Sequence, residues 1–209
     1  MNKQGIITVI SGFSGAGKGT VVRQLVEQYD YVVSVSATTR EPRAGEVDGI
    51  HYFFKTNEEF EEMIQRGELM EHAGYVDHYY GTPKEYVMQQ LAQGTDVILE
   101  IEMQGALQVK ENYPEAVLVF LTPPSYNELR NRLHGRGTET EEMIAKRLQR
   151  AAEECVYLEK YDYIVVNGDL NTCVEQVHQL IQSVHLKRKY RQGLIDEIIE
   201  DFASHSGQP

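Results

Sequence analysis

A glycine-rich segment at residues 12–18 carries the clearest chemical signal in the sequence. It reads Gly12, Phe13, Ser14, Gly15, Ala16, Gly17 and Lys18, which matches the spacing G-x-x-x-x-G-K. Glycines let successive backbone N–H groups turn inward and cradle an anion at the positive end of a following helix. The lysine then reaches the outer phosphates of a nucleoside triphosphate. The segment predicts binding of such a triphosphate without specifying the reaction.

The residues on either side place this segment between a strand and a helix. Residues 6–10 are an apolar, β-branched run, and a helical pattern of apolar residues begins just after Gly19, with Val21, Val22 and Leu25. The alternative interpretation is a glycine-rich turn that arose by chance. Such a turn would not need a strand before it and a helix after it, so the context favours a phosphate loop.

The position after the lysine departs from the usual motif. Gly19 stands where a serine or threonine hydroxyl normally ligates Mg²⁺, and Thr20 follows one place later. Because Mg²⁺ dehydrates reluctantly, we expect the bound phosphates to hold the ion, with a carboxylate bound through water. Glu100, near the end of an apolar strand pattern, is the expected outer-sphere partner.

Apolar runs and helical patterns alternate along much of the chain. Strand patterns lie at residues 31–35, 97–101, 117–121 and 163–166, and helical patterns at residues 60–66, 85–93 and 106–111. This alternation predicts an α/β fold with a central, mostly parallel sheet flanked by helices.

Two stretches interrupt the alternation and are expected to be insertions. Residues 34–84 are rich in Gly, Thr, Tyr and charged residues, with a short strand candidate at residues 51–54. Residues 125–158 are polar, helical and rich in arginine. Ser125 with Glu128, and Thr138 with Glu141, have the spacing of capping boxes, which predicts a helical hairpin around residues 135–137.

Composition excludes several classes of protein. The formal net charge of -12, from 20 Lys+Arg against 32 Asp+Glu, disfavours binding to long nucleic acid. The cysteines, Cys155 and Cys173, are too few for a disulfide framework. No apolar run approaches the roughly 18 residues of a membrane span, and no signal-peptide pattern opens the chain, so we expect a cytoplasmic protein.

The richest segment, residues 34–46, reads SVSATTREPRAGE and is followed by Tyr52, Glu71 and the run YYGT at residues 79–82. Through these motifs the sequence closely resembles the guanylate kinase family, and the matches extend from the phosphate loop to Asn167-Gly168-Asp169. The resemblance implies a P-loop NTPase fold. It also implies an enzyme that transfers the γ-phosphoryl group of ATP to GMP, and to dGMP.

The resemblance also implies a division of the chain. A guanylate-kinase-like domain covers residues 1–185, with its core at residues 1–33, 85–124 and 159–185. Residues 34–84 become the GMP-binding insertion and residues 125–158 the lid. Residues 186–209 form a helical tail, for which a solvated helix is the expectation and a binding arm the alternative.

Site residues follow from the matching motifs. The GMP phosphate is assigned to Arg40, Arg43, Tyr52 and Tyr80, and guanine to Ser36, Glu71, Thr82 and Glu102, with Glu46 and Gly81 completing the GMP set. The ATP set is residues 12–18 with Gly19, Thr20, Arg132, Arg136 and Asn167. The catalytic set is Lys18, Arg40, Arg136 and Arg147.

The chemistry of these residue types agrees with the assignment. Arginine forks and phenolic hydroxyls suit a phosphate dianion. Guanine presents N1–H and N2–H₂ side by side, so the Glu71 carboxylate can accept both, whereas adenine would present a lone pair. No general base is needed because the attacking phosphate oxygen is already anionic, and catalysis is expected to be positional and electrostatic.

Alternatives remain open at this stage. Singly, Arg40 and Arg43 could be surface charges and Glu71 a helix-face carboxylate; the joint pattern favours a site. A catalytically inactive scaffold module of this family, an AMP kinase and a ribose-bisphosphate kinase are the rival functions.

Glu100 and Glu102 stand where aspartate is commoner in the family, and the histidines show no ligand spacing. ATP and GMP are the expected partners, with neither nucleic acid nor membrane, in a monomer or homodimer.

Overall fold

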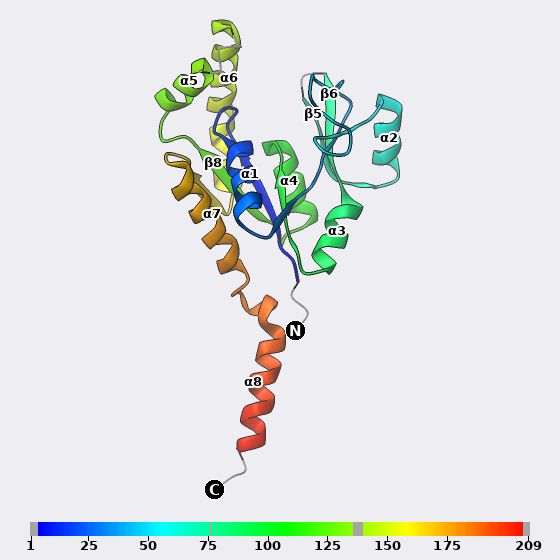
Figure 1. The fold of residues 1–209 in the computed structure, drawn as a ribbon, viewed down its shortest axis with the longest axis vertical. Helices are drawn as coiled ribbons and strands as arrows, with labels where there is room; N and C mark the ends of the chain where they lie inside the picture. The colour runs from blue at the N-terminus through cyan, green and yellow to red at the C-terminus, as the bar shows by residue number, and fades with distance from the viewer. Residues whose placement is uncertain (1–3, 76, 136–139, 207–209) are drawn as a thin grey trace.

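A five-stranded parallel sheet in the order β2-β7-β1-β8-β9 forms the centre of the computed structural model, which describes residues 4–75, 77–135 and 140–206 (Figure 1). The strands are β1 (Ile7–Gly12), β2 (Tyr31–Val33), β7 (Asp96–Glu100), β8 (Val117–Thr122) and β9 (Tyr163–Val166). This confirms the predicted α/β class with a mostly parallel central sheet.

The central strand β1 is buried along its whole length because helices cover both faces of the sheet. Val9 belongs to one apolar cluster and its neighbour Ile10 to the other, since successive strand side chains point to opposite faces. Helices α1 (Lys18–Gln28) and α7 (Leu170–Val184) pack on the Ile10 side. The Val9 side is covered by helices α3 (Lys84–Ala92), α4 (Met103–Asn112), α5 (Tyr126–Gly135) and α6 (Glu141–Glu154).

Residues 34–84 build a second sheet of four strands in the order β4-β3-β6-β5. The elements are β3 (Ala37–Thr38), β4 (Phe53–Phe54), α2 (Asn57–Gln65), β5 (Leu69–Tyr75) and β6 (His78–Pro83). The strand expected at residues 51–54 is therefore shorter than predicted. The helix expected at residues 60–66 begins earlier, because Thr56 and Glu59 form a capping box.

The arginine-rich stretch contains the helices α5 and α6, followed by a 3₁₀ helix, η1 (Cys155–Lys160). The Ser125 hydroxyl accepts a hydrogen bond from Glu128 N at 3.2 Å, as the sequence predicts. The prediction of a second cap at Thr138 is wrong. Thr140 precedes α6 instead, and its hydroxyl accepts a hydrogen bond from Met143 N. Glu141 is thus the first helical residue, and Thr138 lies outside the described residues.

The C-terminal segment leaves the domain after α7. A short 3₁₀ helix, η2 (Arg188–Arg191), leads into α8 (Gln192–His205), which extends away from the rest of the molecule (Figure 1). The tail is helical, as predicted, but its direction could not be inferred from the sequence. Among the described residues, no helix combines the length and apolar character needed to cross a bilayer.

A buried carboxylate fixes the end of α7 to the sheet. Asp96, at the start of β7, is 3% exposed and accepts from Ile6 N at 2.9 Å. Its other oxygen lies 2.8 Å from Nε2 of His185, the residue that ends α7. One side chain thereby joins β1, β7 and the C-terminal segment.

We predict that Asp96→Ala lowers the free energy of unfolding by about 2–4 kcal/mol, because a buried amide and an imidazole lose their acceptor. Urea denaturation measures the effect, and Asp30→Ala, at an exposed aspartate, is the matched control. Equal midpoints for both variants would contradict the anchoring role of Asp96.

Candidate nucleotide-binding site

The predicted phosphate loop follows β1 directly, at the carboxyl end of the central strand, and ends where α1 begins. Gly15 and Gly17 have φ angles of 97° and 93°, in the left-handed region that favours glycine. A Cβ on Gly17 would lie 2.6 Å from Asn167 Nδ2, and one on Gly15 would lie 2.9 Å from Leu133 Cδ2. These two positions therefore require glycine for both conformation and space.

Side chains from three distant segments hold this loop. Asn167 Nδ2 donates to Ala16 O at 2.8 Å. Arg132 of α5 donates to Asn167 O at 2.8 Å and to Ala16 O at 3.4 Å. Arg147 of α6 donates from Nη1 to the Ser14 hydroxyl. The predicted ATP residues Arg132 and Asn167, and the predicted catalytic Arg147, are thus gathered at the loop.

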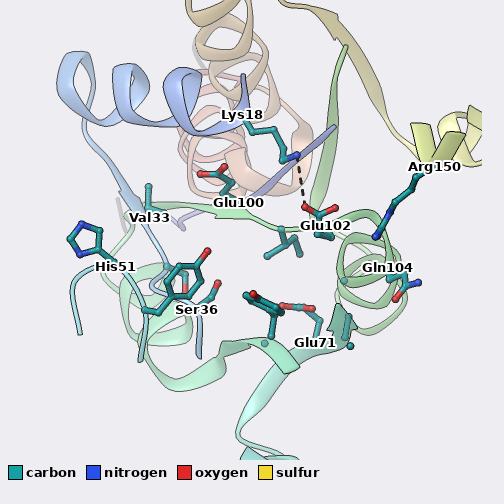
Figure 2. Close-up of a pocket in the computed structure, with 17 residues that line it drawn as sticks. Lys18, Val33, Ser36, His51, Glu71, Glu100, Glu102, Gln104 and Arg150 are labelled. Carbon is teal, nitrogen blue, oxygen red and sulfur yellow. Dashed lines mark ion pairs between the residues drawn. The ribbon is translucent and has the colours of Figure 1, made fainter. Parts of the chain in front are cut away.

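Lys18 is the first residue of α1, and its ammonium group folds back over the loop. Nζ donates to Gly12 O at 2.7 Å and lies 4.0 Å from Glu102 Oε1, the contact drawn as a dashed line in Figure 2. The charge is therefore held between the loop and Glu102, the residue that precedes α4. Thr20, also predicted for ATP, lies in the first turn of α1.

Glu100 occupies the space beside Gly19. A Cβ built on Gly19 would lie 3.4 Å from Glu100 Oε1, so the carboxylate stands next to the position of the usual hydroxyl. Desolvation by the surrounding protein raises the pKa of Glu100, nearby Lys18 lowers it and Glu102 raises it. Oxygen ligands of this kind suit Mg²⁺. In the parts of the chain that the structure describes, no three His, Cys, Asp or Glu residues form a metal cluster.

A cavity of about 320 Å³ lies between the phosphate loop and the second sheet (Figure 2). Of the residues predicted to bind GMP, those that line it are Ser36, Tyr52, Glu71, Tyr80, Gly81 and Glu102. Lys18 and Glu100 line its opposite wall. The cavity therefore joins the phosphate loop to the predicted acceptor residues in a single space.

Glu71 is the most buried charged group in this cavity, at 5% exposure. Burial raises its pKa to about 7, although hydrogen bonds from Thr82 oppose the shift. Thr82 Oγ1 donates to Glu71 Oε1 at 2.8 Å. Thr82 itself does not line the cavity, so it acts here by orienting Glu71.

Arg40, Arg43 and Glu46 lie outside the lining of the cavity and form a cluster on its rim. Arg40 Nη2 lies 2.8 Å from Glu46 Oε1, and its guanidinium group lies 5.4 Å from the centre of the Tyr52 ring. Glu46 Oε2 accepts from Arg43 N at 2.7 Å. This backbone hydrogen bond is the main cause that lowers the pKa of Glu46, and Arg40 lowers it further. Glu46 thus fixes Arg40 beside Tyr52 and Tyr80.

The cavity also includes residues to which the sequence analysis gave no role. They are Val33, Ser34, His51, Ala73, Gly74, Ile101, Gln104, Gly105 and Arg150. The Ser34 hydroxyl is buried without a hydrogen-bond partner in the described structure, which suits an incoming ligand. Arg150 follows Arg147 by nearly one turn of α6, a spacing that could have been noticed.

One predicted residue has no place in this description. Arg136, assigned to both the catalytic and the ATP set, lies outside the described residues.

Comparisons with known proteins agree with this geometry. The family model described as guanylate kinase matches residues 4–184. The chain belongs to the guanylate kinase family. A guanylate kinase of Caldanaerobacter subterraneus subsp. tengcongensis is 55% identical over 182 residues, which cover 87% of this chain and 88% of the relative. One of Oceanobacillus iheyensis is 50% identical over 205 residues, covering 98% and 100%.

A solved structure of the family shows the same fold. The crystal structure of guanylate kinase from Anaplasma phagocytophilum superposes with a TM-score of 0.74 at 33% identity, and covers 89% of each chain. The chain is therefore a nucleoside-monophosphate kinase by family, and a transferase.

Gly105, in the first turn of α4, leaves the space that the Glu71 side chain occupies. A Cβ at Gly105 would lie 2.3 Å from Glu71 Oε2 and 2.8 Å from its Cδ. The first turn of α4 therefore packs directly on the buried carboxylate, and any larger residue there must displace it.

We predict that Gly105→Ala lowers the free energy of unfolding by about 1–3 kcal/mol through overpacking, although alanine is the better helix former. Gly74→Ala is the matched control, since its Cβ would meet nothing within 4 Å. Urea denaturation compares the two variants. If Gly105→Ala were as stable as the wild type, the close packing on Glu71 would be refuted.

Proposed function

We propose that this chain transfers the γ-phosphoryl group of ATP to a phosphate oxygen of GMP, giving ADP and GDP, and that it also accepts dGMP. The observation that carries the proposal is that Lys18 of the phosphate loop and the buried Glu71 line one cavity. In the reaction, the bond between the β–γ bridging oxygen and the γ-phosphorus breaks, and the acceptor oxygen forms the new bond. The bridging oxygen leaves on ADP.

Glu71 supports guanine as the acceptor base. When ionised, its carboxylate accepts the adjacent N1–H and N2–H₂ groups, with Thr82 holding one oxygen in place. Adenine would direct a lone pair at the same carboxylate, which leaves a buried charge without a donor. Ser36 and Glu102, on the same cavity, complete the polar contacts proposed for the base.

The rim cluster supports binding of the acceptor phosphate. Arg40 is held by Glu46 and packs on the Tyr52 ring, so its planar fork is oriented before a ligand arrives. Tyr52 and Tyr80 add hydroxyl groups from the cavity wall. Arg43 follows on the exposed side and adds a second guanidinium group.

The donor triphosphate is assigned to the phosphate loop. Backbone N–H groups of residues 13–17 bind its phosphates, and Lys18 lies where the charge of the migrating group develops. Arg132 and Arg147 come from the helical segment above the loop and add positive charge there. The nucleophile is an anionic phosphate oxygen, so no side chain has to remove a proton.

Mg²⁺ fits as a companion of the donor. Glu100 would hold the ion through water, beside Gly19 and close to Lys18. When bound, Mg²⁺ neutralises charge on the outer phosphates.

The direct test measures ADP release with GMP, dGMP, AMP, CMP and UMP as acceptors in the presence of ATP and Mg²⁺. Turnover with GMP that exceeds turnover with AMP at least about 100-fold supports the proposal. Faster ADP release with AMP than with GMP would indicate a different kinase. No ADP release with any of the five acceptors would indicate a non-catalytic module.

We predict that Lys18→Ala lowers kcat about 100-fold or more, because it removes charge from the transferring group. Stability should change by less than about 1 kcal/mol, since the lysine is not part of the apolar core. Lys160→Ala, at an exposed lysine, is the matched control for the coupled assay and the denaturation curves. Near-normal turnover of Lys18→Ala would rule out the role.

We also predict that GMP binding weakens about tenfold from pH 8 to pH 6, because Glu71, with a pKa of about 7, is protonated at the lower pH. A protonated carboxyl presents an O–H and loses one acceptor position. Calorimetric titration of GMP measures the effect. Glu71→Gln controls for ionisation of the ligand phosphate, and an equally steep profile in that variant would contradict the assignment.

A further inference from the structure

One face of helix α4 binds the backbone of strand β5. Gln108 Nε2 donates to His72 O at 2.8 Å, and Gln108 Oε1 accepts from His72 N at 3.1 Å. About one helical turn further along, Asn112 Nδ2 donates to Met70 O at 3.4 Å. The two residues of the strand that α4 binds are therefore the chain neighbours of Glu71, one on each side.

These contacts fall on an edge of the second sheet. In the described structure the strand order is β4-β3-β6-β5, so β5 has a neighbouring strand on one side only. An edge strand leaves backbone N–H and C=O groups without ladder partners. The carboxamide of Gln108 has a donor and an acceptor, as a peptide group has, so it pairs with His72 as a further strand would.

The ladder on the other side of β5 is irregular at the same place. Leu69 pairs with Pro83 and His72 pairs with Gly81, so β5 holds one residue more than β6 over this stretch. Such a bulge interrupts the regular ladder and redirects nearby side chains. The ladder alone therefore does not fix the backbone at Glu71, and the contacts from α4 supply the missing constraint.

Helix α4 also belongs to the core that carries the phosphate loop. Its residues Ala106 and Val109 are fully buried in one of the two apolar clusters of the central sheet. Glu102, which precedes the helix, lies 4.0 Å from Lys18 Nζ. The helix contacts β1 as well as β5, and lies between α1 and the second sheet in Figure 1. The position of Glu71 relative to Lys18 is thus set through a single helix.

We propose that Gln108 is a positioning residue for acceptor recognition, which holds Glu71 where its carboxylate meets the N1–H and N2–H₂ groups of guanine. This role rests on the proposed function, because Gln108 does not line the cavity and acts through Glu71. Loss of its hydrogen bonds should displace the Glu71 carboxylate. The phosphate loop and Arg40 would keep the contacts that hold them.

Selection between GMP and inosine monophosphate tests this role, since the second base lacks the 2-amino group. Gln108→Met keeps the length of the side chain and removes both hydrogen bonds to His72. We expect the ratio of kcat/KM for GMP to kcat/KM for inosine monophosphate to fall about tenfold, as for loss of one hydrogen bond to a charged group. KM for ATP should not change.

A merely structural effect would not move this ratio, because partial unfolding lowers both kcat/KM values alike. Gln89→Met is the matched control, since Gln89 lies on an exposed face of α3 and its side chain donates only to Glu85. The control should keep the wild-type ratio.

Two outcomes separate this role from the proposed function. If the wild type selects GMP and Gln108→Met keeps the same ratio, the positioning role is overturned and the proposed function stands. If the wild type turns over both acceptors equally well, the role of Glu71 is contradicted, and that of Gln108 with it.

A double variant tests whether Gln108 acts through Glu71. In a Glu71→Ala background there is no carboxylate to position, so adding Gln108→Met should leave the acceptor ratio unchanged. A further fall of the ratio in the double variant overturns the route through Glu71.

Hydrogen exchange of the His72 amide measures the contact in the wild type, without dependence on the folding of any variant. We expect slow exchange, because this N–H is bonded to Gln108 at an edge of the sheet. Exchange as fast as that of the exposed turn residue Gly45, after correction for intrinsic rates, overturns the proposal.

Discussion

The hydrogen bonds to Ala16 O hold the phosphate loop in the shape on which the rest of the site depends. Within residues 13–17 the chain supplies few contacts of its own, among them Ala16 N to Phe13 O at 2.9 Å. Asn167 and Arg132 bind the Ala16 carbonyl from outside, so the N–H of Gly17, on the opposite edge of the same trans peptide, is directed to the other side. The helical segment over the loop thus has two functions, because its arginines position the cradle and bring positive charge to it. This coupling explains why residues about 150 positions apart in sequence must pack together.

The acceptor side depends on a different constraint, the burial of a carboxylate. Removing Glu71 from water opposes its ionisation, and the Thr82 hydroxyl only partly offsets that cost. In the function proposed here for Glu71, guanine supplies the missing donors, so the base that satisfies the carboxylate is the one that binds. Gly105 leaves room for this arrangement because α4 approaches Glu71 without a side chain at that position. On this proposal, specificity comes from a buried carboxylate that is unfavourable until a ligand supplies its donors.

Much of this organisation could be predicted from the sequence, because it is encoded locally. The strands β1, β7, β8 and β9 follow continuous apolar runs, and their predicted bounds differ little from those observed. Boundaries set by a few side-chain contacts were less predictable, as the misplaced Thr138 cap and the unrecognised Thr56–Glu59 cap show. The phosphate loop was evident from its motif, whereas the acceptor role of Arg40 and Arg43 is a prediction that rests on the family resemblance. The packing of Gly105 on Glu71 and the ion pair of Glu46 with Arg40 could not be predicted, because each depends on contacts that only the folded chain brings together.

In the proposed reaction, donor and acceptor phosphates meet end to end in the cavity that Lys18 and Glu71 both line. A ligand that joins adenosine and guanosine through five phosphates spans both halves of that site, and calorimetry measures its affinity beside those of ATP and GMP. We predict one molecule per chain and an affinity at least about 100-fold above that of either nucleotide, because linkage makes the second binding step intramolecular. An affinity no higher than that of the tighter single nucleotide would contradict the arrangement.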